Sequence, residues 1–237
     1  MTEILNKSAV SCMQSFVDEL VQQATDAGMI VNGRKTKEIL FGSILKDPPL
    51  SVTLSGTAVE RVATFKLLGV HIANDLKWLQ HVDAISSKVS SRLHFLKQLK
   101  RSGAGPEDLL YFYVIAIRPV LEYACPAWHS SLTAAQTKAL ESLQRRAMKI
   151  IFPDKDYSLS LIFASVDTLE SRREQLTERF FRRSVLRESS CLHYLLPDKR
   201  DSAITDRLRR AKTFASFSIR TEKFRKSFIP YCLNHFD

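Results

Sequence analysis

Apolar residues near the start of the chain recur at steps of three and four, the spacing of one face of an α-helix. The run extends from Ser8 to Gly28, and a glycine suits the position just after the end of a helix. The pattern predicts one amphipathic helix over residues 8–28. Its apolar positions are Val10, Met13, Phe16, Val17, Leu20, Val21 and Ala24.

Short runs rich in β-branched and aromatic residues follow this helix, and turn signals separate them. The turn signals are Asn32-Gly33, Pro48-Pro49 and Gly56. Together they predict a small, mostly antiparallel sheet beside the one helix. The runs lie at 29–31, 37–41, 50–54, 59 and 65–72.

The apolar period becomes helical from Trp78 onward, and the rest of the chain is predicted to be helical. A first helix is expected to end at about Arg101, with apolar positions 82, 85, 89, 93, 96 and 99 on one face. A second begins at Gly105-Pro106, because proline suits the first turn of a helix. Two prolines interrupt it, so we expect a bend near Arg118 and an end near Cys125.

Two further helix starts follow from residues that cap a helix N-terminus. Thr133 and Gln136 form a capping box that opens a helix through about Ile151, and residues 167–170 carry a similar signal. After Pro197 the chain is basic and weakly periodic, with isolated aromatic residues, which predicts a loosely packed tail.

The order of these elements predicts an α+β fold in three parts. Residues 1–73 form the small sheet with its helix, 74–196 form a helical region, and 197–237 form the basic tail. A sheet this small exposes an edge and an apolar face, so we expect the first part to have low stability alone.

Composition places the chain among ordinary globular proteins. Apolar residues make up 45% and charged residues 25% of its 237 residues. The longest uncharged apolar run, Leu109 to Ile117, is about half of the roughly 18 residues needed to cross a bilayer. The first residues lack the pattern of a signal or transit peptide. We therefore expect an intracellular protein, cytoplasmic or nuclear, without a membrane partner.

The net charge of +10 is concentrated in the second part of the chain. Residues 1–90 contain 9 of the 35 Lys and Arg and 9 of the 25 Asp and Glu, which leaves 26 and 16 for residues 91–237. Such a surplus favours a polyanionic partner, because neutralising phosphates releases their counterions. A basic face that only keeps the protein soluble is the alternative.

Candidate phosphate contacts come from basic residues in three places: a turn, the end of the first long helix, and a stripe on the capped helix. Helix-end dipole interactions or a solvated helix face are the alternative explanations. The candidates are Lys35 in the turn, Arg92, Lys97, Lys100 and Arg101 on the first helix, and Arg145, Arg146 and Lys149 on the capped helix.

Several motifs occur in a fixed order. The turn 31–37 is followed by Phe65-Lys66-Leu67-Leu68-Gly69, then by Trp78 with His81-Val82, by residues 117–129 and by residues 143–147. In this order they resemble the C-terminal half of the reverse transcriptase of non-LTR (LINE-type) retrotransposons, with its last palm motifs, thumb and basic tail.

The resemblance implies roles for particular positions. Lys35 and Thr36 would lie near the incoming nucleotide and template, and Leu68-Gly69 would help to place the primer end. Asn32 is a further position of the family motif. The thumb helices would follow the backbone of RNA or of an RNA–DNA duplex. The family's catalytic aspartates hold two Mg²⁺ ions, and this chain contains no Asp-Asp dipeptide.

The resemblance therefore implies a catalytically inactive, truncated reverse-transcriptase-like protein that is not an enzyme as it stands and needs no cofactor. It would be at most a non-specific binding module for RNA or a primer–template duplex. The fingers and the rest of the palm would belong to a longer gene product. The alternative is a translated relic of a retroelement with no function of its own.

Histidines raise a different alternative. His81 and Asp83 have the His-x-Asp spacing of a non-haem iron site, with His129 or His193 as a third ligand. Residues 108–144 also resemble a short N-terminal segment of AlkB-type tRNA-modifying proteins, which would imply an Fe(II)/2-oxoglutarate dioxygenase or a tRNA methyltransferase-associated protein. We disfavour this, because His81 begins a helix and the chain has no glycine-rich cofactor loop. We predict no metal site.

Overall fold

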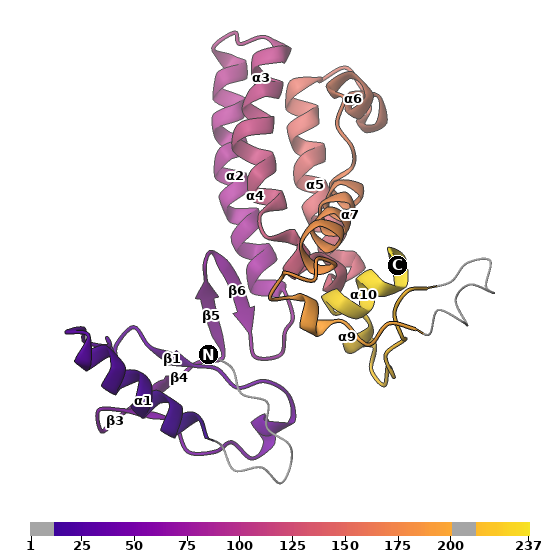
Figure 1. Cartoon of the computed structure of the whole chain (residues 1–237). Coiled ribbons are helices and arrows are strands. Elements are labelled where there is room, and N and C mark those ends of the chain that lie inside the picture. Colours follow the sequence, from indigo (N-terminus) through magenta and orange to yellow (C-terminus); the bar gives the residue numbers. More distant parts are fainter. Residues whose placement is uncertain (1–11, 201–211) are drawn as a thin grey trace. The chain divides into compact units, whose positions relative to one another are not determined.

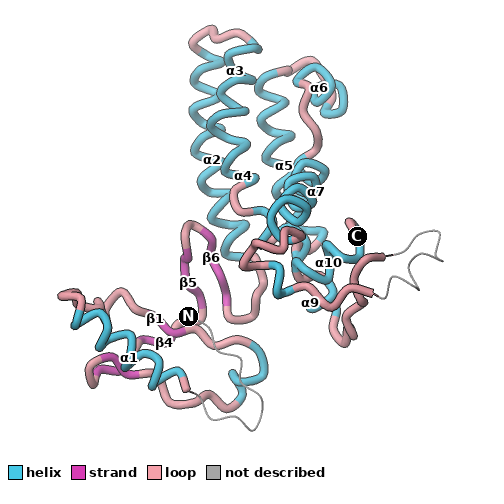
Figure 2. Tube along the Cα trace, viewed as in Figure 1, coloured by secondary structure: helices cyan, strands magenta, loops and turns pink. Residues whose placement is uncertain are grey.

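The computed structural model describes residues 12–200 and 212–237, and it divides into two compact units, Met1–Gln80 and His81–Asp237 (Figure 1). The first, here the N-terminal unit, contains a helix and all the paired strands, and the second, the helical unit, is built from helices (Figure 2). The α+β class is therefore confirmed. The units divide at Gln80 rather than at the expected residue 73, and the helical unit includes the residues described after 197.

The strands of the N-terminal unit form three separate two-stranded sheets rather than one sheet. Each of the first four strands is two residues long. The expected strand at 29–31 is absent, and Ile30 there is 96% exposed, so burial does not hold this run extended. The pairs are β1 (Lys37–Glu38) parallel to β4 (Glu60–Arg61), β2 (Thr53–Leu54) antiparallel to β3 (Thr57–Ala58), and β5 (Thr64–Leu67) antiparallel to β6 (Val70–Ala73).

The run predicted at 65–72 is a tight hairpin, with Leu67 opposite Val70. Leu68 and Gly69 form its turn with φ values of 47° and 89°. Two successive positive φ values match the twist of a two-residue hairpin. Glycine adopts this conformation freely, whereas leucine is strained there. A leucine is therefore not a turn signal, and the sequence alone does not predict the turn at Leu68.

The helix α1 (Met13–Asp26) buries none of its side chains, although its apolar stripe is the one predicted. The expected start at Ser8 lies outside the described residues. Gln14 joins α1 to β2, because its amide donates to the Thr53 carbonyl at 3.0 Å and accepts from the Thr53 N–H at 2.7 Å. The 3₁₀ helix η1 (Gly42–Lys46) completes the elements of this unit.

The helical unit begins with a long hairpin of helices. The first arm is α2 (Leu79–Arg101), and five of its predicted apolar positions, 82, 85, 89, 93 and 96, are buried. The sixth, Leu99, is 37% exposed. The second arm consists of α3 (Pro106–Phe112), the π-helix η2 (Tyr113–Ile117) and α4 (Arg118–Glu122).

The π-helix explains how the second arm passes Pro119. Proline has no N–H to give to the carbonyl four residues earlier, and its ring clashes with that carbonyl. The wider π turn lies where this bond would form. By length and composition the run Pro106–Ala127 is apolar enough to cross a bilayer, but a core helix of a soluble protein passes the same test.

Side-chain caps begin the remaining long helices as predicted. Thr133 forms a full capping box with Gln136 at the start of α5 (Ala134–Ile151), and Thr168 accepts from the Ser171 N–H at the start of α7 (Leu169–Phe180). Asp156 caps α6 (Tyr157–Ala164) in the same way, a helix start that the sequence reasoning did not predict. The shorter elements are η3 (Cys125–Ala127), η4 (His129–Ser131), the π-helix η5 (Phe181–Val185), η6 (His193–Leu195), α9 (Glu222–Arg225) and α10 (Phe228–His235).

The loosely packed tail expected after residue 197 is not found in the described residues 212–237. Phe214, Cys232 and Leu233 are buried together with Phe181 and Val185 of η5 in one hydrophobic cluster. The aromatic side chains of the last segment therefore stabilise the end of α7, because their burial removes apolar surface from water. Residues 201–211 lie outside the described part.

Candidate nucleic-acid interface

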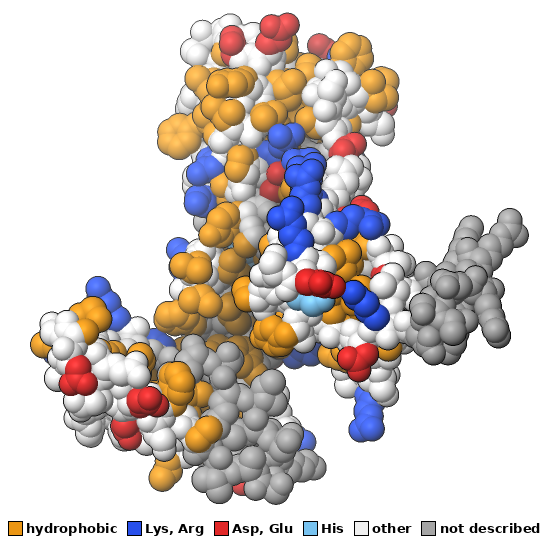
Figure 3. Space-filling model, in the orientation of Figure 1, with side chains coloured by type: hydrophobic (Ala, Val, Ile, Leu, Met, Phe, Trp, Pro, Cys, Tyr) orange, Lys and Arg blue, Asp and Glu red, His pale blue; other side chains and the backbone are white. Residues whose placement is uncertain are grey.

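Basic side chains gather in a stripe over the middle of the helical unit (Figure 3). Sequence reasoning assigned seven basic residues of this unit to phosphate binding. Their hydrogen bonds and exposure separate those that face water freely from those that the fold itself uses.

Of the four candidates on α2, two are bonded to the backbone of the fold and two are not. Arg92 donates to the Ala116 carbonyl of the π-helix η2, and the Lys100 ammonium donates to the Ile151 carbonyl at 3.3 Å. Both side chains satisfy carbonyls near irregular or terminal turns, where backbone acceptors lack partners. Lys97 and Arg101 are exposed and make no ion pair or hydrogen bond with any described residue.

The candidates on α5 divide in a similar way. The Arg145 guanidinium lies over the Tyr157 ring, 4.4 Å from its centroid, and the Lys149 ammonium donates to the Pro153 carbonyl at 2.6 Å. Arg146 is exposed and has no partner within the described ranges. Lys97, Arg101 and Arg146 are therefore the predicted residues of the helical unit that remain free for an external anion.

Lys35 belongs to the N-terminal unit, where Asn32 builds the predicted turn. The Asn32 side chain accepts from the Lys35 N–H at 3.1 Å, and the Asn32 carbonyl accepts from the Thr36 hydroxyl at 3.0 Å. Such side-chain bonds stabilise turns. The Lys35 side chain is exposed, and Leu68 at the hairpin turn is 83% exposed.

Three further arginines, which the sequence reasoning missed, lie on α7, on η5 and just after η5. Arg179, Arg183 and Arg187 recur every four residues, and each is exposed without a partner in the described part of the chain. Their neighbour Arg182 pairs with Glu178 at 2.8 Å. Steps of four residues advance about 6 Å along a helix, so Arg179 and Arg183 form a row on α7 and η5, and Arg187 follows two residues after the end of η5. Their spacing in the sequence was the available signal.

The tryptophans and tyrosines between residues 78 and 128 fall into two groups. Trp128 and Tyr113 are fully buried, and Trp78 is 8% exposed, so these three belong to the core. Tyr111 and Tyr123 are 67% and 53% exposed. An exposed aromatic ring is able to stack on a base.

The histidines named as weak metal candidates have other partners. The His81 ring meets the Trp128 ring edge-on at 5.3 Å, Asp83 is exposed, and His129 lies 3.1 Å from the Glu174 carboxylate. Across residues 12–200 and 212–237, no group of three or more His, Cys, Asp or Glu is placed to hold a metal ion.

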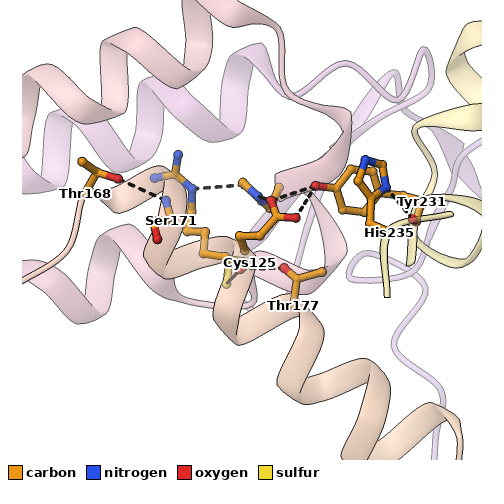
Figure 4. A network of polar contacts seen from close by, with 9 residues as sticks. Cys125, Thr168, Ser171, Thr177, Tyr231 and His235 are labelled. Atoms are coloured by element: carbon orange, nitrogen blue, oxygen red, sulfur yellow. Dashed lines mark hydrogen bonds and ion pairs between the residues drawn. The ribbon is translucent and has the colours of Figure 1, made fainter. Parts of the chain in front are cut away.

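His129 belongs to a polar network that ties α7 to the C-terminal helix (Figure 4). Arg173 Nε donates to His129 Nδ1 at 3.4 Å, which leaves the ring proton on Nε2 facing Glu174. Tyr231 of α10 donates to the same carboxylate at 2.8 Å, and its ring stacks on His235 with centroids 4.2 Å apart. The network holds α10 in place.

We expect the stability of the helical unit to fall as the pH drops below about 6.5, the ordinary histidine value. Burial lowers the pKa of His129, so the unfolded chain binds a proton more readily than the folded chain over this range. Stability therefore rises with pH there. Melting temperatures from pH 7.5 to 5 measure this, and the decline is expected to be smaller in His129→Gln. An equal decline in this variant would assign the effect to other groups.

No family model, no curated protein and no solved structure matches this chain. The resemblance to non-LTR reverse transcriptases therefore stays a prediction from the sequence. The function has to be argued from the surface of the helical unit itself.

Proposed function

We propose that the helical unit binds the phosphate backbone of RNA or of an RNA–DNA duplex without base specificity. The proposal rests on one observation: exposed basic side chains that have no carboxylate partner among the described residues recur on three helical segments. They are Lys97 and Arg101 on α2, Arg146 on α5, Arg179 on α7, Arg183 on η5, and Arg187 just after the end of η5. Each is free to contact a phosphate and release a counterion.

The proposal narrows the set of residues that carry binding. Arg92, Lys100, Arg145 and Lys149 already contact carbonyls or a ring within the fold, so an external phosphate would have to compete with those contacts. Arg101 and the row on α7 and η5 have no such competition. Phosphate contacts fix position without reading sequence, which agrees with a non-specific binder. The proposal assigns no catalytic step to the chain.

The test is fluorescence anisotropy of a labelled RNA and an RNA–DNA hybrid titrated with the full chain over a salt series. The logarithm of the affinity is expected to fall linearly with the logarithm of the salt concentration. In the variant Arg179→Ala/Arg183→Ala we expect weaker binding to every sequence and a salt slope shallower by about two.

Arg182→Ala is the matched control, because Arg182 lies between the two on the same segment but pairs with Glu178 at 2.8 Å. Its salt slope is expected to stay within about half a unit of the parent. An equal loss in the control would mean that net charge alone drives binding. No binding at low salt would overturn the proposal and favour a relic without function.

A further inference from the structure

An open apolar groove runs between α2 and the α3–η2 arm of the helical unit. Its volume is about 870 Å³, and its walls include Phe95 and Leu99 on α2 and Phe112 and Ile115 on the other arm. Phe95 is 60% and Ile115 53% exposed. Figure 3 shows hydrophobic side chains on the surface at the upper end of the helical unit, where α2 connects to α3. Exposed apolar surface of this kind marks an interaction site.

The polar residues of the groove are already bonded within the chain. Arg92 donates to the Ala116 carbonyl, Gln98 contacts His94 at 3.3 Å, and Ser102 donates to the Leu99 carbonyl at 2.8 Å. A polar small molecule would therefore find few free donors or acceptors. The open apolar walls instead match the ridge of another helix, which packs by inserting its side chains between those of two neighbours.

Charges of opposite sign stand at the two ends of the groove. Lys88 lies two turns before Phe95 on α2, and Asp108 lies two turns before Ile115 on the other arm, so each is on the same helix face as a groove residue. The two arms are antiparallel, which places Lys88 and Asp108 at opposite ends. Both side chains are exposed and unpaired within the described chain.

We propose that the groove is the self-association surface of the chain, and that its occupant is the same groove of a second copy. In a twofold arrangement the residues of one copy meet the complementary residues of the other. An antiparallel approach brings the Lys88 end of each copy to the Asp108 end of its partner and buries Phe95 and Ile115 between them. Two helical hairpins then form a four-helix bundle.

Self-association does not use the surface assigned to nucleic acid. Lys97 is two residues from both Phe95 and Leu99, and two residues on a helix turn the side chain about 200° away. The α7–η5 row belongs to other elements. A dimer therefore leaves the basic residues exposed. If the chain did not dimerise, the binding of RNA expected under the proposed function would be unchanged.

The test is sedimentation equilibrium of the full chain and of three charge variants, at about 1–100 µM protein. The parent chain is expected to form dimers. Lys88→Glu and Asp108→Lys are each expected to weaken dimerisation about tenfold, because each places like charges together at both ends of the interface. The double variant Lys88→Glu/Asp108→Lys restores opposite charges and is expected to recover dimerisation.

Glu107→Lys is the matched control for Asp108→Lys. It makes the same charge change in the first turn of α3, with the same effect on the helix dipole, but on a face turned about 100° away. It is expected to leave the dimer intact. Circular dichroism of every variant checks that the helices are retained.

A chain that stays monomeric at the highest concentration, or a double variant no better than the singles, would overturn the proposal. Dimerisation unaffected by Phe95→Asp would also overturn it, because Phe95 lies at the centre of the proposed contact. A parent chain that is monomeric in buffer but binds lipid vesicles would assign the groove to a membrane surface and likewise overturn it.

Discussion

Replacing Trp128 with alanine is expected to lower the free energy of unfolding of the helical unit by about 3–5 kcal/mol. The Trp128 side chain is fully buried, so its removal leaves a large cavity among side chains that relax only in part. The ring also receives the edge of His81 at 5.3 Å, and the Arg173 guanidinium lies 5.7 Å from its centroid. Both groups would lose an aromatic neighbour.

The indole contributes a polar contact as well. Its Nε1–H donates to the Tyr123 carbonyl at 3.0 Å, which fixes the turn where the second arm of the hairpin ends. Ala124 in this turn has φ of 51°, a left-handed conformation that needs support from its surroundings. Losing the indole therefore removes packing and a bond that holds a strained turn.

Urea unfolding followed by circular dichroism measures the effect. A loss of this size is a large fraction of the roughly 5–15 kcal/mol that stabilises a typical domain, so the variant is expected to be partly unfolded at 37 °C. Tyr111→Ala is the control, because Tyr111 is an aromatic residue of the same unit but 67% exposed. Its effect is expected to stay within about 0.5 kcal/mol. Similar losses in both variants would contradict this account of the core.

Helices whose start and buried face are set by near neighbours were predictable. The Thr133 capping box and the buried positions of α2 depend on residues three or four apart, so the sequence pattern carries them. The strands were predicted less well. The strand β1 is defined by its partner β4, which is distant in the sequence. Alternation cannot locate runs of two residues such as β1 and β2.

The described residues 212–237 also show where prediction from local sequence fails. Phe214 and Leu233 have no regular spacing to mark them as core, yet both are buried in one cluster with Phe181 of η5. Their burial depends on the tertiary arrangement, which can override any local preference. A weak period therefore led to the expectation of a loose tail where the structure has a packed one.

The sequence does not distinguish basic side chains that bond within the fold from those that face water. Lys97 and Lys100 look alike in the pattern of α2, but Lys100 reaches the carbonyl that ends α5 while Lys97 faces water. Which backbone carbonyls lack partners follows from where helices end against one another. The predicted basic residues lie on α2 and α5, but only some of them are free to bind an external anion.

Gln144→Leu is expected to destabilise the helical unit by about 2–5 kcal/mol through loss of hydrogen bonds, with little change in volume. Gln144 was noted in the sequence only as part of a family motif, yet its side chain is fully buried. Its carbonyl accepts from the Tyr113 hydroxyl, and its amide donates to the Tyr157 hydroxyl at 3.0 Å and the Asp167 carbonyl at 2.9 Å.

These bonds connect the hairpin arm, α5, α6 and the start of α7 through one side chain. Burial raises the pKa of Tyr113 well above its usual range, so its hydroxyl stays protonated and donates to Gln144 at any ordinary pH. Leucine at position 144 would leave the buried Tyr113 hydroxyl without this partner, and such a group costs about 1–3 kcal/mol. The bonds to Tyr157 and Asp167 would be lost as well.

A double-mutant cycle with Tyr113→Phe separates the hydrogen bond from packing. Tyr113→Phe removes the hydroxyl that Gln144→Leu leaves without its partner, so the double variant is expected to be more stable than the sum of the single effects by about 1–2 kcal/mol. Urea unfolding of the parent and the three variants measures this coupling. Strictly additive losses would show that Gln144 contributes through its volume alone and that the hydrogen bond to Tyr113 does not stabilise the fold.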